Sequence, residues 1–389
     1  MVAPAKGWRS RTWQRERLAG FAANRALWEE SRNQVPLRRG RTSADVAMIA
    51  VAFVVVGSDL ALLGLGCYLL IGPFIGSVRI LGVLLVLIAL ECRPRMPRLR
   101  DAYGVVSDAS SPHLRQLLDM VSAEIGAPQI AEMRLEADYN ASCFCAGWRR
   151  RPVLTIGLPL WAAIDDDARL ALLGHEVGHL VNGDPTTALY GVWGGGSIQR
   201  LAEIFSPRKA RTFVRESHIQ SFESFAGLVL SVLFVVPYLV FSGLATVLWR
   251  LSMRDQKQAE IYADALGLRL GGSAGLIGLH KALLFDRTIE TAVRSAARAS
   301  ADPAVWKAAA SAAIAQREAA VPRAIQRSIR HDAERYGSHP PAGLRLRLAQ
   351  GWPAAPPAVI APDAIMRAID RELSPHYADV RRTLIHGDT

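Results

Sequence analysis

Cysteine is scarce in this chain of 389 residues, which contains only Cys67, Cys92, Cys143 and Cys145. Their spacing matches neither a disulfide framework nor a four-cysteine zinc site. Reduced thiols in a cytosol-facing protein are the simpler interpretation. An apolar core near the N-terminus is also missing, because residues 1–42 are polar and basic. We therefore expect no cleaved signal peptide.

Negative charge is in the minority, with 35 acidic residues against 46 basic ones, so that the formal net charge is +11. Half of the residues are hydrophobic, and this combination is typical of a membrane protein with basic flanks. No nucleic-acid-binding fold signature accompanies the basic clusters. We therefore expect the lipid bilayer, and no nucleic acid, as a partner. The sequence leaves the oligomeric state open.

Two long apolar runs lie near the N-terminus, at residues 46–71 and 74–90. Each is long enough to cross a hydrocarbon core of about 30 Å as a helix. Residues 43–92 therefore predict a transmembrane helical hairpin, preceded by a basic cytosolic arm over residues 1–42. Because arginines flank both ends of the hairpin, the positive-inside rule places both ends in the cytoplasm. This predicts a multi-pass protein of the cytoplasmic membrane whose following domain faces the cytoplasm.

The segment His175-Glu176-Val177-Gly178-His179 lies in a run that predicts a helix, with Asp165 or Asp166 as its cap. Residues at i and i+4 share one face of a helix, so His175 and His179 can bind one metal ion together. Glu176 is adjacent and can activate a water molecule as a general base. The alternative is a chance match on an amphipathic helix.

A third ligand is predicted in the helix over residues 254–270. Glu260 from this second helix would complete a His2Glu zinc site with a fourth position open to water. Asp264, one turn further on, can accept a hydrogen bond from a ligand histidine and fix its tautomer. The alternative is an ordinary acidic helix face, and only the position downstream of the histidine motif favours the metal site.

A small antiparallel sheet is predicted ahead of the histidine motif. Residues 111–125 predict an amphipathic helix, and short extended runs follow at 132–136 and 152–156. An edge strand beside a protease site commonly accepts the substrate as one further strand. The candidate residues for this edge are Asn140, Val153, Leu154 and Thr155, and plain core strands are the alternative.

Two apolar segments separate the histidine motif from Glu260, at residues 186–205 and 225–249. If His175 and Glu260 bind one metal ion, the intervening chain must cross the bilayer an even number of times. Residues 186–205 can be the partner span, or the second segment can fold back near Pro237, or it can be a core helix that never crosses. Two and four spans both stay open.

The arrangement closely resembles the HtpX-type membrane metallopeptidases, which are gluzincins related to the CAAX prenyl proteases. The resemblance rests on the histidine motif, on Glu260-Ile261-Tyr262-Ala263-Asp264 and on Ser338-His339-Pro340-Pro341 with Arg345. It implies that His175, His179 and Glu260 bind one zinc ion, that Glu176 is the general base and acid, and that His339 steadies the oxyanion. The fold implied is mainly α with a small antiparallel β-sheet, a helical zincin domain attached to transmembrane helices.

The sequence therefore predicts a membrane-bound zinc endopeptidase that hydrolyses peptide bonds of membrane-associated or misfolded polypeptides. The catalytic domain is expected over residues 93–350, followed over residues 351–389 by a Pro/Ala-rich extension with a short helix at 363–373. One alternative is a CAAX-type prenyl-protein protease. Another is a non-catalytic membrane scaffold with a structural zinc site.

Overall fold

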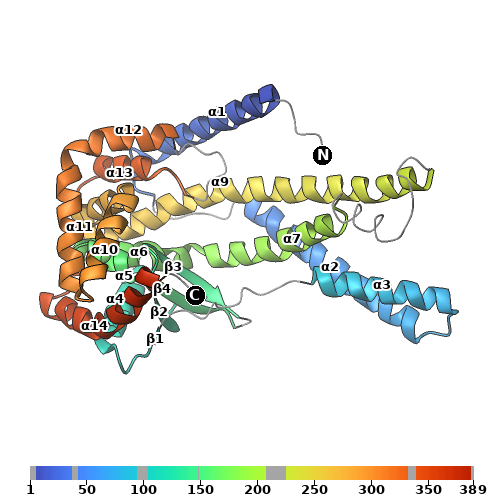
Figure 1. Cartoon of the computed structure of the whole chain (residues 1–389), viewed down its shortest axis with the longest axis horizontal. Coiled ribbons are helices and arrows are strands. Elements are labelled where there is room, and N and C mark those ends of the chain that lie inside the picture. The colour runs from blue at the N-terminus through green and yellow to red at the C-terminus, as the bar shows by residue number, and fades with distance from the viewer. Residues whose placement is uncertain are drawn as a thin grey trace. The chain divides into compact units, whose positions relative to one another are not determined.

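A computed structural model describes residues 6–36, 43–93, 104–147, 149–206, 225–331 and 339–386 (Figure 1). Outside the described residues lie Ser338, most of the basic stretch after residues 43–92, and the basic segment 207–215, which follows the apolar segment 186–205. The chain divides into two compact units. Unit 1 comprises Met1–Gly40, Pro97–Pro185 and Gln256–Thr389, and unit 2 comprises Arg41–Met96 and Thr186–Asp255.

Unit 1 is mostly helical, as predicted, with a small sheet at one side (Figure 1). Its helices are α1 (Lys6–Ser31), α4 (Pro112–Ile125), α5 (Leu158–Ala163), α6 (Asp166–Asn182), α10 (Asp286–Ala299), α11 (Pro303–Arg317), α12 (Val321–His331), α13 (Ala342–Gly351) and α14 (Asp363–His386), with the 3₁₀ turn η1 at Glu318–Ala320. The predicted amphipathic helix α4 is confirmed. All five apolar residues of its expected face are buried: Leu114, Leu117, Leu118, Val121 and Ile125.

The sheet contains four strands in the order β1-β2-β4-β3. The strands are β1 (Val105–Val106), β2 (Glu132–Glu136), β3 (Ala141–Ala146) and β4 (Arg151–Gly157). The two predicted strands, β2 and β4, pair in parallel, so the prediction of an antiparallel sheet is wrong and the sheet is mixed. The physical reason is β3: it reverses the chain between β2 and β4 and forms an antiparallel hairpin with β4.

The predicted substrate edge is also wrong for three of its residues. Val153, Leu154 and Thr155 lie on the central strand β4, which pairs with β2 on one side and β3 on the other. Because both edges of β4 are already hydrogen-bonded, it cannot accept a further strand. Asn140 immediately precedes β3, and its carbonyl oxygen accepts a hydrogen bond of 2.8 Å from the Gly157 amide. The edge strand of the sheet on this side is β3.

The C-terminal helix α14 covers 24 residues, which is longer than the short helix predicted over 363–373. It continues through Pro375 because its apolar face continues beyond that residue: Ile369, Leu373, Tyr377 and Val380 are all buried. The Glu372 carboxylate accepts hydrogen bonds from the first amides of α4, at His113 and Leu114. In this way α14 stabilises the start of α4.

Arg169 joins α14 to the start of α6. Its side chain is 2% exposed, and its guanidinium forms ion pairs of 3.1 Å with both Asp166 and Asp370. It also donates a hydrogen bond of 3.0 Å to the Trp161 carbonyl oxygen. A buried guanidinium is stable only with such partners. The first turn of α6 therefore depends on a carboxylate from the last helix of the chain.

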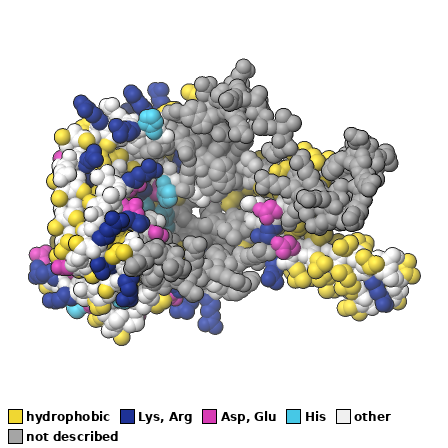
Figure 2. Space-filling view, in the orientation of Figure 1, with side chains coloured by type: hydrophobic (Ala, Val, Ile, Leu, Met, Phe, Trp, Pro, Cys, Tyr) yellow, Lys and Arg dark blue, Asp and Glu magenta, His cyan; other side chains and the backbone are white. Residues whose placement is uncertain are grey.

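Unit 2 contains α2 (Ser43–Ile71), α3 (Gly76–Cys92), α7 (Asp184–Ile204) and the first part of α9 (Phe225–Leu284). Helices α2 and α3 form a hairpin, and Gly66 and Gly82 let their backbones touch: a Cβ atom on Gly66 would lie 3.0 Å from the Gly82 carbonyl oxygen. Large hydrophobic side chains are exposed along both helices, and they gather over this hairpin in Figure 2.

One helix among the described residues, Asp45–Ile71, is long and apolar enough to cross a bilayer. The apolar helix Phe234–Leu248 is shorter, and α3 contains 17 residues. The predicted hairpin of two spans therefore stays a prediction. Helix α9 continues through Pro237 without a break, which rules out the alternative that the chain folds back there. Its one non-helical residue is Gly272.

Candidate metalloprotease site

Helix α6 holds the two motif histidines in place. Asp165 is its N-cap, as one of the two predicted alternatives, and the carboxylate accepts a hydrogen bond of 2.8 Å from the Ala168 amide. The helix ends at Asn182. Because His175 and His179 are one turn apart, their rings lie on one face with centroids 4.9 Å apart.

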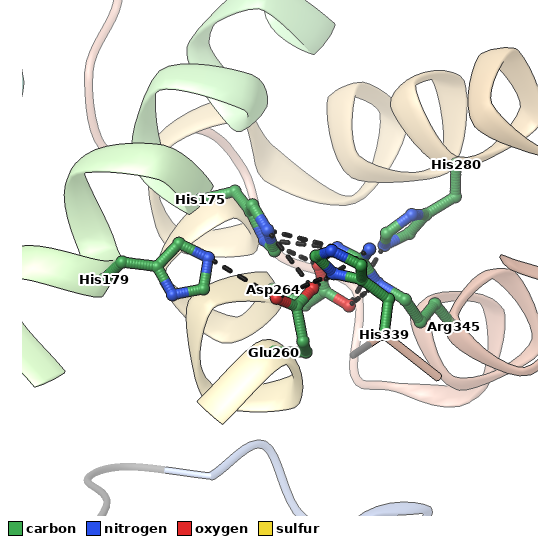
Figure 3. Close-up of polar contacts among 7 residues, drawn as sticks. All are labelled: His175, His179, Glu260, Asp264, His280, His339 and Arg345. Atoms are coloured by element: carbon green, nitrogen blue, oxygen red, sulfur yellow. Dashed lines mark hydrogen bonds and ion pairs between the residues drawn. The ribbon is translucent and has the colours of Figure 1, made fainter. Parts of the chain in front are cut away.

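Helices α9 and α6 pack so closely that their backbones are in contact. A Cβ atom on Gly174, next to His175, would lie 2.9 Å from the Leu266 carbonyl oxygen. A Cβ atom on Gly267 would lie 2.8 Å from the Ala171 carbonyl oxygen. Only glycine permits this approach without displacing the backbone. The close contact brings the preceding turns of α9, which hold Glu260 and Asp264, against the histidines of α6 (Figure 3).

The structure brings the three predicted ligands together. Glu260 Oε2 lies 3.6 Å from His175 Nε2, and Glu260 Oε1 lies 3.6 Å from His179 Nε2. The three donor atoms lie within 4.8 Å of one another. Ligand atoms of tetrahedral zinc with bonds of about 2.0–2.1 Å are about 3.4 Å apart. Two nitrogen donors and one carboxylate at these separations fit a zinc ion.

Asp264 contacts His175 on the side away from Glu260. The distance from Asp264 Oδ1 to His175 Nδ1 is 3.0 Å, and the Asp264 side chain is 2% exposed. A carboxylate at Nδ1 favours the tautomer with its proton on that nitrogen, which leaves the Nε2 lone pair for a metal. Asp264 lies beside His175 Nδ1, and its predicted role in fixing the histidine tautomer stays a prediction.

Arg345 on α13 ties the two carboxylates together. Its guanidinium donates to Asp264 Oδ2 at 2.8 Å through Nε and to Oδ1 at 2.5 Å through Nη2. Its Nη1 lies 3.2 Å from Glu260 Oε2, although Oε2 accepts no hydrogen bond of good geometry from the described residues. In the sequence, only the resemblance indicated Arg345. Arg345 is far from α9 along the chain, so no local pattern predicts its contacts with Asp264 and Glu260.

His339 lies at Glu260. Its Nδ1 is 2.9 Å from Glu260 Oε1, while 64% of its side chain is exposed. The ring is therefore anchored at one nitrogen and open to solvent elsewhere. Its predicted role at the oxyanion stays a prediction.

Burial and charge set the ionisation of the site. Burial raises the pKa of Glu176 to about 7, and the nearby charge of Glu260 adds to this effect, while His179 and Arg345 oppose it. Burial also acts to raise the pKa of Glu260, but the charge of Arg345 and the hydrogen bond from His339 outweigh it, and the pKa falls to about 2. Burial lowers the pKa of His175 to about 4, with Arg345 adding to it.

Two residues near the site were not predicted to have a role there. Burial raises the pKa of Cys143 on β3, and the nearby charge of Glu176 contributes, so the edge strand lies close to Glu176. His280, in the last turns of α9, lies 3.3 Å from Asp264 (Figure 3). No sequence motif includes His280, so only the folded chain shows its position.

A family model described as peptidase family M48 matches residues 109–353. The chain belongs to this family. Protease HtpX of Pseudomonas putida is 27% identical over 226 residues, which are 57% of this chain and 70% of that protein. Protease HtpX of Stutzerimonas stutzeri is 27% identical over 198 residues, 49% of this chain and 64% of that protein. A protein of the same name from Pseudomonas aeruginosa is 27% identical over 197 residues, again 49% of this chain and 64% of that protein.

No solved structure matches the chain. The predicted membership in the HtpX-type family is confirmed, and this M48 peptidase is a metalloprotease that acts on polypeptides. The match includes every predicted ligand and catalytic residue, and it excludes α2, α3 and α14.

Proposed function

We propose that this M48 peptidase is a zinc-dependent endopeptidase of the cytoplasmic membrane, with its site facing the cytoplasm. The observation that carries the proposal is the convergence of His175, His179 and Glu260 from two helices, with donor atoms within 4.8 Å. Zinc suits two imidazole nitrogens and one carboxylate, and a site with three protein ligands leaves one position for water or substrate.

The residues around this position have complementary roles in peptide hydrolysis. A bound zinc ion would polarise the attacking water and the scissile carbonyl. Glu176, with a pKa of about 7, can accept the proton of that water near neutral pH and then deliver it to the leaving amine. His339, anchored through Nδ1 to Glu260, can donate to the carbonyl oxygen as negative charge develops there.

The substrate backbone is proposed to pair with the outer edge of β3 (Ala141–Ala146). In the described part of the chain, β3 pairs with β4 alone, so its other edge is available for main-chain hydrogen bonds. The charge of Glu176 affects Cys143 on this strand, which supports its nearness to the site. This proposal replaces β4 with β3 as the strand that receives substrate.

The membrane assignment rests on unit 2. Helix α2 is long and apolar enough to cross a bilayer, and its large hydrophobic residues are exposed, as at Phe53 and Val54. Arginines on both sides of residues 43–92 favour a cytoplasmic position for both ends. We propose that α2 and α3 form a hairpin in the membrane and that polypeptides in or near the membrane are the substrates.

Replacing Glu176 with Gln tests the proposal. The amide cannot accept a proton, but the three ligands are unchanged, so we expect the purified variant to retain one zinc ion per chain and to lose cleavage of an unfolded membrane protein. The loss should be at least about 100-fold, the usual contribution of general base catalysis. Cleavage at the wild-type rate would overturn the mechanism, and absence of zinc from the wild-type chain would overturn the metal assignment.

Comparing an unfolded protein with a prenylated peptide separates the two protease alternatives. We expect the unfolded protein to be cleaved at internal sites and the prenylated peptide to be cleaved poorly. Efficient cleavage of the prenylated peptide alone would favour the CAAX-type reaction.

A further inference from the structure

His280 is a buried histidine that lies behind Asp264, outside the set of predicted site residues. Its side chain is 1% exposed, and its Nε2 is 3.3 Å from Asp264 Oδ2 (Figure 3). Neither ring nitrogen has a well-aligned hydrogen bond within the described residues. An imidazole always carries a proton on at least one nitrogen, and a buried donor without an acceptor is costly. The acceptor that the structure places within reach is the Asp264 carboxylate.

A bend in α9 explains how His280 reaches Asp264. The bend is at Gly272, which lies between the two residues and has φ 66° and ψ −179°. This backbone conformation is essentially limited to glycine. Without the bend, the sixteen-residue separation would place His280 several turns along the helix axis, well away from Asp264. Because of this bend, the last turns of α9 lie beside the site and place His280 near Asp264.

Residues 353–360, which follow α13, hold this bend in place, and we call them the strap. The Ser273 amide donates to the Ala355 carbonyl oxygen at 3.0 Å, and the Ala355 amide donates to Ser273 Oγ at 2.9 Å. The Ala358 amide donates to the Arg269 carbonyl oxygen at 2.8 Å. These bonds satisfy backbone groups on both sides of Gly272 that the interrupted helix leaves unpaired.

We propose that His280 is a positioning residue for the metal ligand His175, acting through Asp264. The proposed donor is His280 Nε2, which lies 3.3 Å from Asp264 Oδ2, an oxygen that also accepts from Arg345 Nε. With Oδ2 held in this way, Oδ1 stays directed at His175 Nδ1 at 3.0 Å. His175 then keeps its Nδ1 proton and presents the Nε2 lone pair to the metal. This inference rests on the proposed metal site.

Two polar substitutions distinguish positioning from simple filling of the core. A Gln side chain can place its amide nitrogen where His280 has Nε2, whereas an Asn amide reaches only the position of Nδ1. We expect His280→Asn to weaken zinc affinity by about tenfold and His280→Gln by less than about threefold, since partners of metal-binding histidines contribute about 10- to 100-fold. The full-length chain is purified in detergent, stripped of metal and titrated with zinc against a chromophoric chelator.

Cobalt supplies a second measurement that does not depend on proteolysis. The cobalt-loaded wild type and His280→Gln should share one visible absorption spectrum, and His280→Asn should differ because the orientation of His175 changes. Leu276→Ala is the matched control. Leu276 is fully buried in the same part of α9, so this variant should lower thermal stability and leave zinc affinity and the cobalt spectrum unchanged.

The outcomes separate the inference from the proposed function. If both His280 variants bind zinc as the wild type does, or if both lose affinity equally, the positioning role is overturned and the metal site stands. If Leu276→Ala weakens zinc binding as much as His280→Asn does, the effect is general loss of packing and the inference is again overturned. A wild-type chain that binds no zinc overturns the proposed function together with this inference.

Discussion

In unit 1 charged and ionisable side chains are buried, whereas in unit 2 large hydrophobic side chains are exposed. Glu260, Asp264 and Arg345 are each less than 10% exposed, and each contacts an opposite charge within 3.2 Å. Along α2 and α3, Phe53, Val54 and Leu60 are each more than 60% exposed. The buried charges of unit 1 are therefore compensated by groups of the same chain. The free energy of the exposed hydrophobic side chains of unit 2 depends instead on whether water or lipid surrounds them.

Removing the central cation of unit 1 should give the largest effect on this comparison. Arg345→Met leaves Asp264 and Glu260 buried without their shared partner, which should destabilise the fold by about 3–5 kcal/mol. Thermal unfolding of the metal-free protein measures the change. Arg347→Met is the control on the same helix, because Arg347 is exposed and stacks on the Trp28 ring at 4.9 Å. Equal stability of the two variants would contradict the compensation described for unit 1.

The corresponding change in unit 2 adds a charge to the exposed face of α2. Leu60→Arg lies well inside the candidate span, where arginine costs about 2.5–3.5 kcal/mol for membrane insertion. We expect a reduced fraction of the protein in membranes that resist alkaline extraction. Ile71→Arg, at the end of the helix, should have little effect because the side chain can reach the interface. If the fraction of Leu60→Arg protein in the extracted membranes equals that of the wild type, this face of α2 does not contact lipid.

The pKa of Glu176 predicts that the stability of unit 1 depends on pH. Its folded pKa of about 7 lies above the ordinary value of 4.5, so ionising Glu176 in the folded state lowers the stability of the fold. This cost is absent below pH 4.5 and grows as the pH rises towards 7. The metal-free Glu176→Gln variant should therefore match the wild type at pH 4.5 and exceed its stability at pH 8, by about 3 kcal/mol at most. A stability difference that does not change with pH would contradict the raised pKa.

Glycine substitutions compare the packing of the two units. Gly267→Ala places a methyl group against the Ala171 carbonyl oxygen, so it should cost about 1–3 kcal/mol and weaken zinc binding by separating α9 from α6. Gly64→Ala in α2 meets nothing within 4 Å and should be neutral or slightly stabilising, because alanine favours helix. Melting temperature and zinc titration measure both variants. A neutral Gly267→Ala would show that the contact between the helices adjusts easily.

Local patterns predicted the elements that carry the site. The spacing of Leu114 to Ile125 identified α4, the motif identified α6, and Glu260 was found from its place on a second helix. Pairing was harder to predict. Periodicity identifies a strand but not its neighbour, so the insertion of β3 and the parallel pairing of β2 with β4 were missed.

The contacts formed by distant residues were the other limit. Arg345 is 81 residues from Asp264 along the chain, and no pattern connects the two. His280 reaches the site only through the bend at Gly272, and the strap that holds this bend comes from later in the sequence. The helix predicted over 363–373 continues through Pro375 to His386, because packing of its apolar face outweighs the local preference of proline against helix.

The contact of Arg169 with Asp370 has a consequence for the time at which the enzyme is completed during its synthesis. The start of α6, the helix that contains His175 and His179, relies on the Asp370 carboxylate of α14, and α4 relies on Glu372 of that same helix α14. A nascent chain on the ribosome cannot supply these partners until α14 has been translated. The protease domain therefore reaches its finished packing only after α14 has emerged from the ribosome.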